Sequence, residues 1–119
     1  MDESILNDVK KLIGIAIANS DFDQDLIIDT NAVLFDMWQM GILVDDYSIS
    51  DATKTWSEVL LNPDKIALNP LKTWTALKVK LIFDPPTSSI LLEAIQENLK
   101  ELQWRIYITE NYVGEIQNA

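Results

Sequence analysis

Apolar positions in the last third of the chain recur at the spacing of a helix. From residue 91 to residue 106 they are separated by four, four, three and four positions, which places them on one side of a helix. These apolar positions are Leu91, Ile95, Leu99, Leu102 and Ile106. The opposite side is polar, with Glu93, Gln96, Glu97, Lys100 and Gln103. The pattern predicts an amphipathic helix that packs one stripe on the rest of the molecule.

A second helix is predicted just before this one, and the two together form a hairpin. Asn69 is expected as its N-cap and Pro70 as its first helical residue. The helix must end near Phe83, because proline lacks an N–H and disfavours helical geometry in the residue before it. The hinge is therefore Phe83-Asp84-Pro85-Pro86. A hydroxyl group is expected to cap the following helix, from Thr87, Ser88 or Ser89.

The N-terminal half predicts two further helices. The first covers Ser4 to Ile13, ends at Gly14, and turns Ile5, Val9, Leu12 and Ile13 inward. Residues 15–18 are expected to form an apolar loop against the body. The second helix opens at Asp21-Phe22-Asp23-Gln24-Asp25 and runs to about Met40, with Gly41 as its stop. Its buried face is predicted to hold Leu26, Ile27, Thr30, Val33, Leu34, Met37 and Trp38.

A short third helix is predicted over residues 51–61, with Ser48 or Ser50 as its cap and Trp56, Val59 and Leu60 inward. Residues 64–68 have room for a single helical turn. All four tryptophans fall within predicted helices, so core packing is expected for each. The fold class is thus all-α: one domain over residues 1–119, a small bundle of four to five helices around the central hairpin.

The second helix also carries an acidic stripe and an amide. The stripe consists of Asp25, Asp29 and Asp36. Asn31 lies at the edge of the apolar face, where we expect its amide to bond to neighbouring backbone. The spacing of Asp21, Asp23 and Asp25 is that of a calcium loop, but the positions of its turn glycine and bidentate glutamate are not matched. We therefore expect these carboxylates to cap the helix rather than to bind a metal.

Composition narrows the function further. The chain has no cysteine and no histidine, and no serine or carboxylate stands in a recognisable catalytic arrangement, so we expect no enzyme, metal or cofactor. The net charge is −10, which disfavours a protein that grips nucleic-acid phosphates. No apolar run reaches the roughly 18 residues of a membrane span.

Two stretches resemble a known family. The run LKVKLIFDPP (77–86) followed by ELQWR (101–105) is similar to the "lk.rl.FDPP" hinge and "E..WR" helix end of small head-tail connector proteins of tailed phages, also called head-completion or neck-adaptor proteins. The run FDQDLIIDTN (22–31) resembles the "FD.dI...iN" signature of the same family. The motif residues with an expected structural role are Phe22, Asp23, Asn31, Phe83, Asp84, Pro85, Pro86, Trp104 and Arg105.

The resemblance implies a structural protein of a phage or prophage virion, made in the host cytoplasm and located in the virion neck. It implies a ring of copies, commonly dodecameric, that sits below the portal protein, extends the DNA channel and receives the next neck or tail protein. DNA would pass through without specific binding, and the acidic stripe would keep the channel wall from adhering to it. The alternative is a monomeric acidic binding module, such as a DNA mimic or inhibitor.

Residues 107–119 are predicted to be a frayed tail or an arm that orders against a partner. Their β-branched and aromatic residues and Gly114 are unfavourable for a helix end. The apolar anchors of this assembly arm are Ile108, Tyr112, Val113 and Ile116.

Overall fold

The structure, a computed structural model, describes residues 4–61 and 68–118, and for residues 107–118 it describes the backbone only. It contains α1 (Ile5–Ile13), α2 (Asp23–Gln39), α3 (Trp56–Val59), α4 (Leu68–Phe83) and α5 (Ser89–Asn118). The described residues form no strand, only two isolated β-bridges. The all-α prediction is confirmed.

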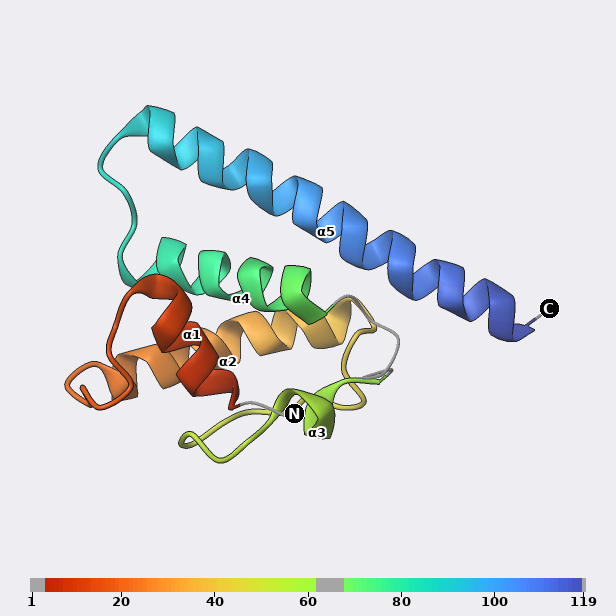
Figure 1. The fold of residues 1–119 in the computed structure, drawn as a ribbon, viewed down its shortest axis with the longest axis horizontal. Helices are drawn as coiled ribbons and strands as arrows, with labels where there is room; N and C mark the ends of the chain where they lie inside the picture. Colours follow the sequence, from red (N-terminus) through yellow and green to blue (C-terminus); the bar gives the residue numbers. More distant parts are fainter. Residues whose placement is uncertain (1–3, 62–67, 119) are drawn as a thin grey trace.

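Helix α4 is the centre of the arrangement. It packs against α1, α2 and α5, and in Figure 1 it lies between α5 on one side and the α1–α2 pair on the other. Its buried side chains include Leu71, Trp74 and Val79. The core therefore lies on both sides of the first arm of the predicted hairpin.

The hinge of the hairpin follows the prediction, and the start of α4 does not. Helix α4 ends at Phe83, and Ser88 caps α5 by accepting a hydrogen bond from the Leu91 N–H at 3.3 Å. Because α4 begins at Leu68, Asn69 is a helical residue and not the N-cap. Pro70 still lies in the first turn, where a missing N–H costs no helical hydrogen bond. The predicted turn before it lies, except for Leu68, outside the described residues.

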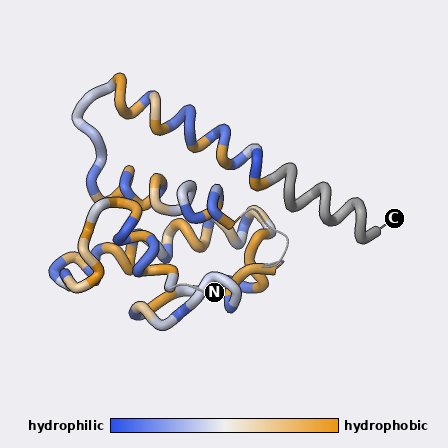
Figure 2. Tube along the Cα trace, in the orientation of Figure 1, coloured by the Kyte–Doolittle hydropathy of each residue, from blue (hydrophilic) through white to orange (hydrophobic). Residues whose placement is uncertain are grey.

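The apolar stripe of α5 becomes more buried as it leaves the hinge. Leu91 is 50% exposed, whereas Ile95, Leu99 and Leu102 are buried and Ile106 is 0% exposed. The prediction of Leu91 as a core residue is wrong because α4 and α5 stand apart at their hinge ends (Figure 1). Along the described part of α5, polar and apolar residues alternate with the turns of the helix (Figure 2).

The end of α5 also differs from the prediction. Its backbone is helical from Ser89 to Asn118, so Gly114 does not interrupt the helix as expected. One glycine costs a helix about 1 kcal/mol, which is too little by itself to end it. The anchors proposed for the assembly arm, Ile108, Tyr112, Val113 and Ile116, have side chains outside the described residues, so that role stays a prediction.

Helices α1 and α2 end where local signals predicted. The Asn7 N–H donates to Ser4 Oγ at 3.2 Å, and Gly14 and Gly41 take the left-handed φ values of 89° and 82° that favour glycine. Residues 15–18 form a loop, as expected, but only Ile15 packs against the body, and Ile17 is 54% exposed. Leu12 (51% exposed) and Trp38 (40% exposed) were placed in the core wrongly. Both lie on the margins of their helices, where spacing alone does not determine burial.

Helix α3 is shorter than predicted. It covers only Trp56–Val59, and its cap is a box between Thr55 and Glu58 rather than Ser48 or Ser50. Residues 51–54 are diverted into a turn in which Asp51 accepts hydrogen bonds from Thr53. After the C-terminal end of α3, the Leu61 N–H donates to the Ile42 carbonyl at 2.8 Å, and the backbone at Leu60 is extended. Trp56, Val59 and Leu60 are buried, as predicted.

Candidate functional site

A buried lysine ties the first loop to the start of α2. Lys10 is 1% exposed, and its ammonium group donates to the Ile17 carbonyl (2.9 Å), the Asn19 carbonyl (2.6 Å) and Asp23 Oδ1 (2.8 Å). All three of its N–H groups are thus used. Asp23 therefore holds Lys10 and does not cap α2, since that helix has no side-chain cap bond. The predicted capping role is wrong for Asp23, and an ion pair replaces it.

A buried carboxylate, that of Asp8, connects three helices. Asp8 accepts a hydrogen bond from Trp56 Nε1 at 2.7 Å and forms an ion pair with Lys72 at 3.1 Å. Asp8 is 6% exposed. A buried carboxylate needs partners, and the indole N–H and the lysine compensate its charge. Sequence analysis did not single out Asp8 or Lys10, because it chose the inward positions of α1 by apolar side chains alone.

Asn31 bonds to backbone as predicted. Its Nδ2 donates to the Ile49 carbonyl at 3.0 Å, and its Oδ1 accepts from the Ile49 N–H at 2.7 Å. Both polar ends of the amide are satisfied, and the loop after α2 is fixed to that helix.

The two sequence motifs meet in space at the hinge. The rings of Phe22 and Phe83 pack edge to face, with their centroids 5.6 Å apart. Asp84 follows Phe83 and forms an ion pair with Lys80 at 3.6 Å. Pro85 and Pro86 carry the non-helical link to α5. The N-terminal motif and the hinge motif are therefore parts of one structural corner.

An open groove lies next to this corner, between α2 and the end of α4. It has a volume of about 230 Å³ and is lined by Asp25, Ile28, Asp29, Ile82 and Phe83; we call it the α2–α4 groove. Partial burial, followed by repulsion from the Asp25 carboxylate, raises the pKa of Asp29 above its ordinary value. Sequence reasoning identified the two aspartates but not the isoleucines, which stand outside the buried stripes of their helices.

The structure separates the third member of the acidic stripe from the other two. Asp36 forms an ion pair with Lys78 of α4 at 3.3 Å. Lys78 also lies over the ring of Trp74, 5.2 Å from its centroid. Asp25 and Asp29 line the α2–α4 groove, whereas Asp36 is engaged beyond it. Only the first two therefore form a common surface.

The outer side of α5 carries the remaining motif. Trp104 lies two residues from both Leu102 and Ile106, which puts it opposite the buried stripe, and it is 60% exposed. Arg105 forms an ion pair with Glu101 at 2.6 Å. The prediction that all four tryptophans pack in the core is wrong for Trp104 and Trp38, and it is confirmed for Trp56 and Trp74.

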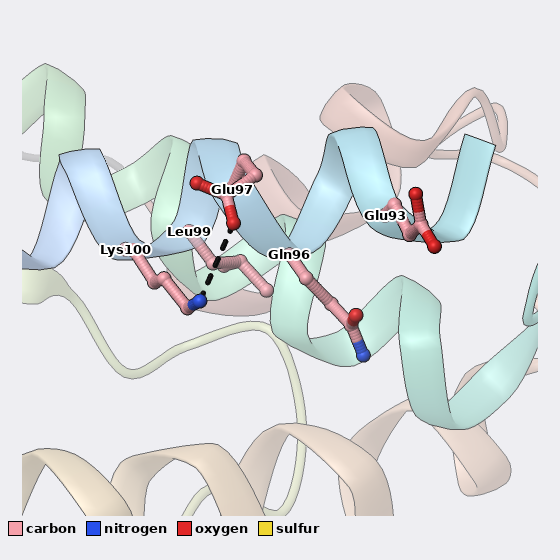
Figure 3. A pocket seen from close by; sticks show the side chains of 5 residues that line it. All are labelled: Glu93, Gln96, Glu97, Leu99 and Lys100. Carbon is pink, nitrogen blue, oxygen red and sulfur yellow. Dashed lines mark hydrogen bonds and ion pairs between the residues drawn. The ribbon is translucent and has the colours of Figure 1, made fainter. Parts of the chain in front are cut away.

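A hollow beside α5 is lined by polar side chains that are paired or open to water. Its volume is about 530 Å³, and its lining residues are Glu93, Gln96, Glu97, Leu99 and Lys100. Figure 3 shows Gln96 and Lys100 extending to the same side of α5, with Glu97 turned back to Lys100 at 3.3 Å. All of these except Leu99 are exposed. This is a solvated helix surface and not an enclosed catalytic site.

Over the described residues, no group of three or more acidic side chains is placed to hold a metal ion. No described helix is both long and apolar enough to cross a membrane.

Comparison with known proteins gives a family assignment. A family model described as phage connector protein matches residues 5–113. No curated protein and no solved structure matches the chain. The match spans all five helices, from the start of α1 into the last turns of α5. The chain belongs to the phage connector protein family.

Proposed function

We propose that this chain is a structural component of the neck of a tailed phage or prophage, where copies of it form a ring below the portal protein. The ring joins the head to the tail, extends the DNA channel and receives the next neck or tail protein. The single observation that carries the proposal is the connector-family match over residues 5–113. The ring, and its dodecameric state, are what the resemblance of the hinge and helix-end motifs to head-tail connectors implies.

The surface of the subunit supports a ring. Head-to-tail contacts in a ring require two different, mutually complementary surfaces on each copy. Helix α2 exposes Phe35 (41%) on the side opposite its core face and Trp38 (40%) at the margin of that face, with the two ring centroids 5.6 Å apart. Helix α5 exposes Ile90 (79%) and Trp104 (60%) on its own outer side. Two unlike apolar surfaces on separate helices fit such a contact.

The charge suits passage of DNA. Adhesion to DNA comes from Lys and Arg that release counterions from phosphates. Among the residues that the structure describes, seven Lys and Arg side chains form ion pairs with carboxylates of the same chain. We propose that the role is structural and includes no catalytic step. The excess of carboxylates would repel the phosphates of passing DNA. The position of the channel wall stays a prediction, and the pairing of Asp36 with Lys78 argues against Asp36 as part of it.

The test is assembly with a portal ring. Purified chain is mixed with the portal of its own phage, and the complex is measured by mass and imaged by electron microscopy. We expect one additional ring on the tail-side face of the portal. In an infection by phage that cannot make the chain, unjoined heads and tails should accumulate. A chain that remains monomeric, ignores the portal and competes with DNA for a nuclease would instead establish the DNA-mimic alternative.

A further inference from the structure

The α2–α4 groove combines exposed apolar side chains with two carboxylates. Ile28 and Ile82 are 66% and 51% exposed, and both line the groove. Phe83 lies beside them and is held by the ring of Phe22. Asp25 and Asp29 stand one helical turn apart along the α2 side. A charged rim around an apolar strip is typical of a surface that recognises a segment of protein.

The carboxylates of the groove have no cationic partner among the described residues. The two lysines of α4 that could approach this side are engaged elsewhere, Lys78 with Asp36 and Lys80 with Asp84. Partial burial, and after it repulsion from the Asp25 carboxylate, raises the pKa of Asp29. A cation brought to the groove from outside would relieve this repulsion.

The charge of the groove also limits what can occupy it. Nucleic acid and anionic lipid are disfavoured, because their phosphates would meet two carboxylates. A second copy of this chain is a poor source of cations, because seven of the Lys and Arg residues that the structure describes are already paired within the same chain. The complement is therefore a different protein that supplies its own Lys or Arg.

We infer that the α2–α4 groove is a docking site for a segment of another protein, one that presents an aliphatic or aromatic side chain flanked by Lys or Arg. The apolar side chain lies between Ile28 and Ile82, and the cations meet Asp25 and Asp29. The site goes beyond ring formation and does not depend on it, since a monomer exposes the same groove.

The experiment uses the full chain and a fluorescein-labelled synthetic peptide with two leucines, one helical turn apart, flanked by arginines. Binding is followed by fluorescence anisotropy at low and at high salt. One comparison peptide replaces the arginines with glutamates, and another replaces the leucines with serines. We expect the first peptide to bind and both comparison peptides to bind at least about tenfold more weakly, because each loses one half of the recognition.

Protein variants then localise the binding. Asp25→Asn together with Asp29→Asn should weaken binding about tenfold, as should Ile28→Ser. The matched controls are Asp45→Asn together with Asp46→Asn, which removes the same charge from an exposed loop, and Ile17→Ser, which changes an isoleucine that is 54% exposed in the loop after α1. Both controls should bind like the unmodified chain. NMR signals of the Ile28 and Ile82 methyl groups should shift on titration, and those of Ile17 should not.

Three results would overturn the inference. One is equal binding by the groove variants and their controls, which would reduce the effect to net charge. Another is methyl shifts confined to other parts of the molecule. The third is self-association of the unmodified chain that the Asp25 and Asp29 changes abolish, because the occupant would then be a second copy.

Discussion

The ammonium group of Lys10 has all of its donors bonded inside the protein, to two loop carbonyls and Asp23. Lysine is rarely buried in this way without a carboxylate partner. The contact fixes the loop between α1 and α2, and with it the position of Phe22 beside the hinge. A single residue of α1 thus helps to shape the corner where the two motifs meet.

Lys10→Met should therefore destabilise the protein by about 3 kcal/mol, because two carbonyls and a carboxylate lose their donor. Equilibrium unfolding in urea measures the loss. Asp23→Asn is the matched control: it keeps an oxygen acceptor and removes only the charge, so its cost should be clearly smaller. A Lys10→Met protein as stable as the original would show that the buried contact contributes nothing.

Asp29 allows a prediction about pH. Its pKa is raised above 3.8 by partial burial and by Asp25, so its ionised form is less favourable in the folded than in the unfolded state. The folded protein then binds the proton more tightly, and this destabilisation is present at neutral pH and disappears as the pH falls through the folded pKa. Asp29→Asn should accordingly raise the thermal midpoint at neutral pH.

The gain should vanish in acid, below the ordinary carboxyl range, where the Asp29 of the unmodified chain is protonated in both states. NMR titration gives a direct check: Asp25→Asn should lower the pKa of Asp29 but leave part of the shift, since burial is its larger cause. An Asp29→Asn variant with an unchanged midpoint at every pH would contradict the electrostatic account.

At the scale of elements, the stripe of α5 gives a prediction with an internal control. Leu99→Ala should cost about 2–5 kcal/mol, because Leu99 is buried against the body. Leu91→Ala removes the same atoms from a side chain that is 50% exposed, and its cost should stay below about 1 kcal/mol. Urea unfolding of both variants makes the comparison. Equal losses would show that the hinge end of α5 packs as closely as its middle.

The start and end of α1, the end of α2 and the hinge between α4 and α5 could be predicted from local signals, whereas the burial of helix faces could not. Ser4, Gly14, Gly41, Ser88 and the two prolines act on their own backbone, so their effect does not depend on the rest of the fold. Burial depends on which helices meet and at what distance. Leu91 has the right spacing and is exposed, because α4 and α5 stand apart at their hinge ends. The start of α3 was predicted wrongly for a local reason: Asp51 accepts hydrogen bonds from Thr53 in a turn, and the helix begins only at Trp56.

The candidate site was predictable only in part. Asp25 and Asp29 stand out in the sequence as a polar stripe, and the motifs single out Phe22 and Phe83. No periodic signal announces Ile28 or Ile82, because an isoleucine on the polar side of a helix resembles an ordinary surface exception. Contact between α2 and the end of α4 brings these residues together, and that contact is a property of the tertiary structure.

At the scale of the whole molecule, the buried side chains and the exposed apolar surfaces lie on different parts of the fold. Internal ion pairs and the α1–α2–α4 core account for most of the buried side chains. The exposed apolar side chains on the outer sides of α2 and α5 and in the α2–α4 groove are the surfaces to which the proposals above assign contacts with other proteins. This division fits a connector, which must fold as a subunit before it meets its neighbours.

The last prediction concerns the end of α5. Residues 107–118 continue the helix beyond Ile106, which is buried. Ordering a chain costs roughly 1–2 kcal/mol per residue for the backbone, so a helix end gains lasting order from a surface that covers its apolar residues. We predict that the segment contributes to assembly through Ile108, Tyr112, Val113 and Ile116.

Deletion of Glu110 to Ala119 should leave the thermal midpoint within a few degrees, whereas virions built with the truncated chain should fail to join heads to tails. Replacing the four apolar anchors with serine in the full-length chain should reproduce the assembly defect without shortening the helix. If the truncated chain unfolds outright, the segment belongs to the folding core and the assembly role is wrong.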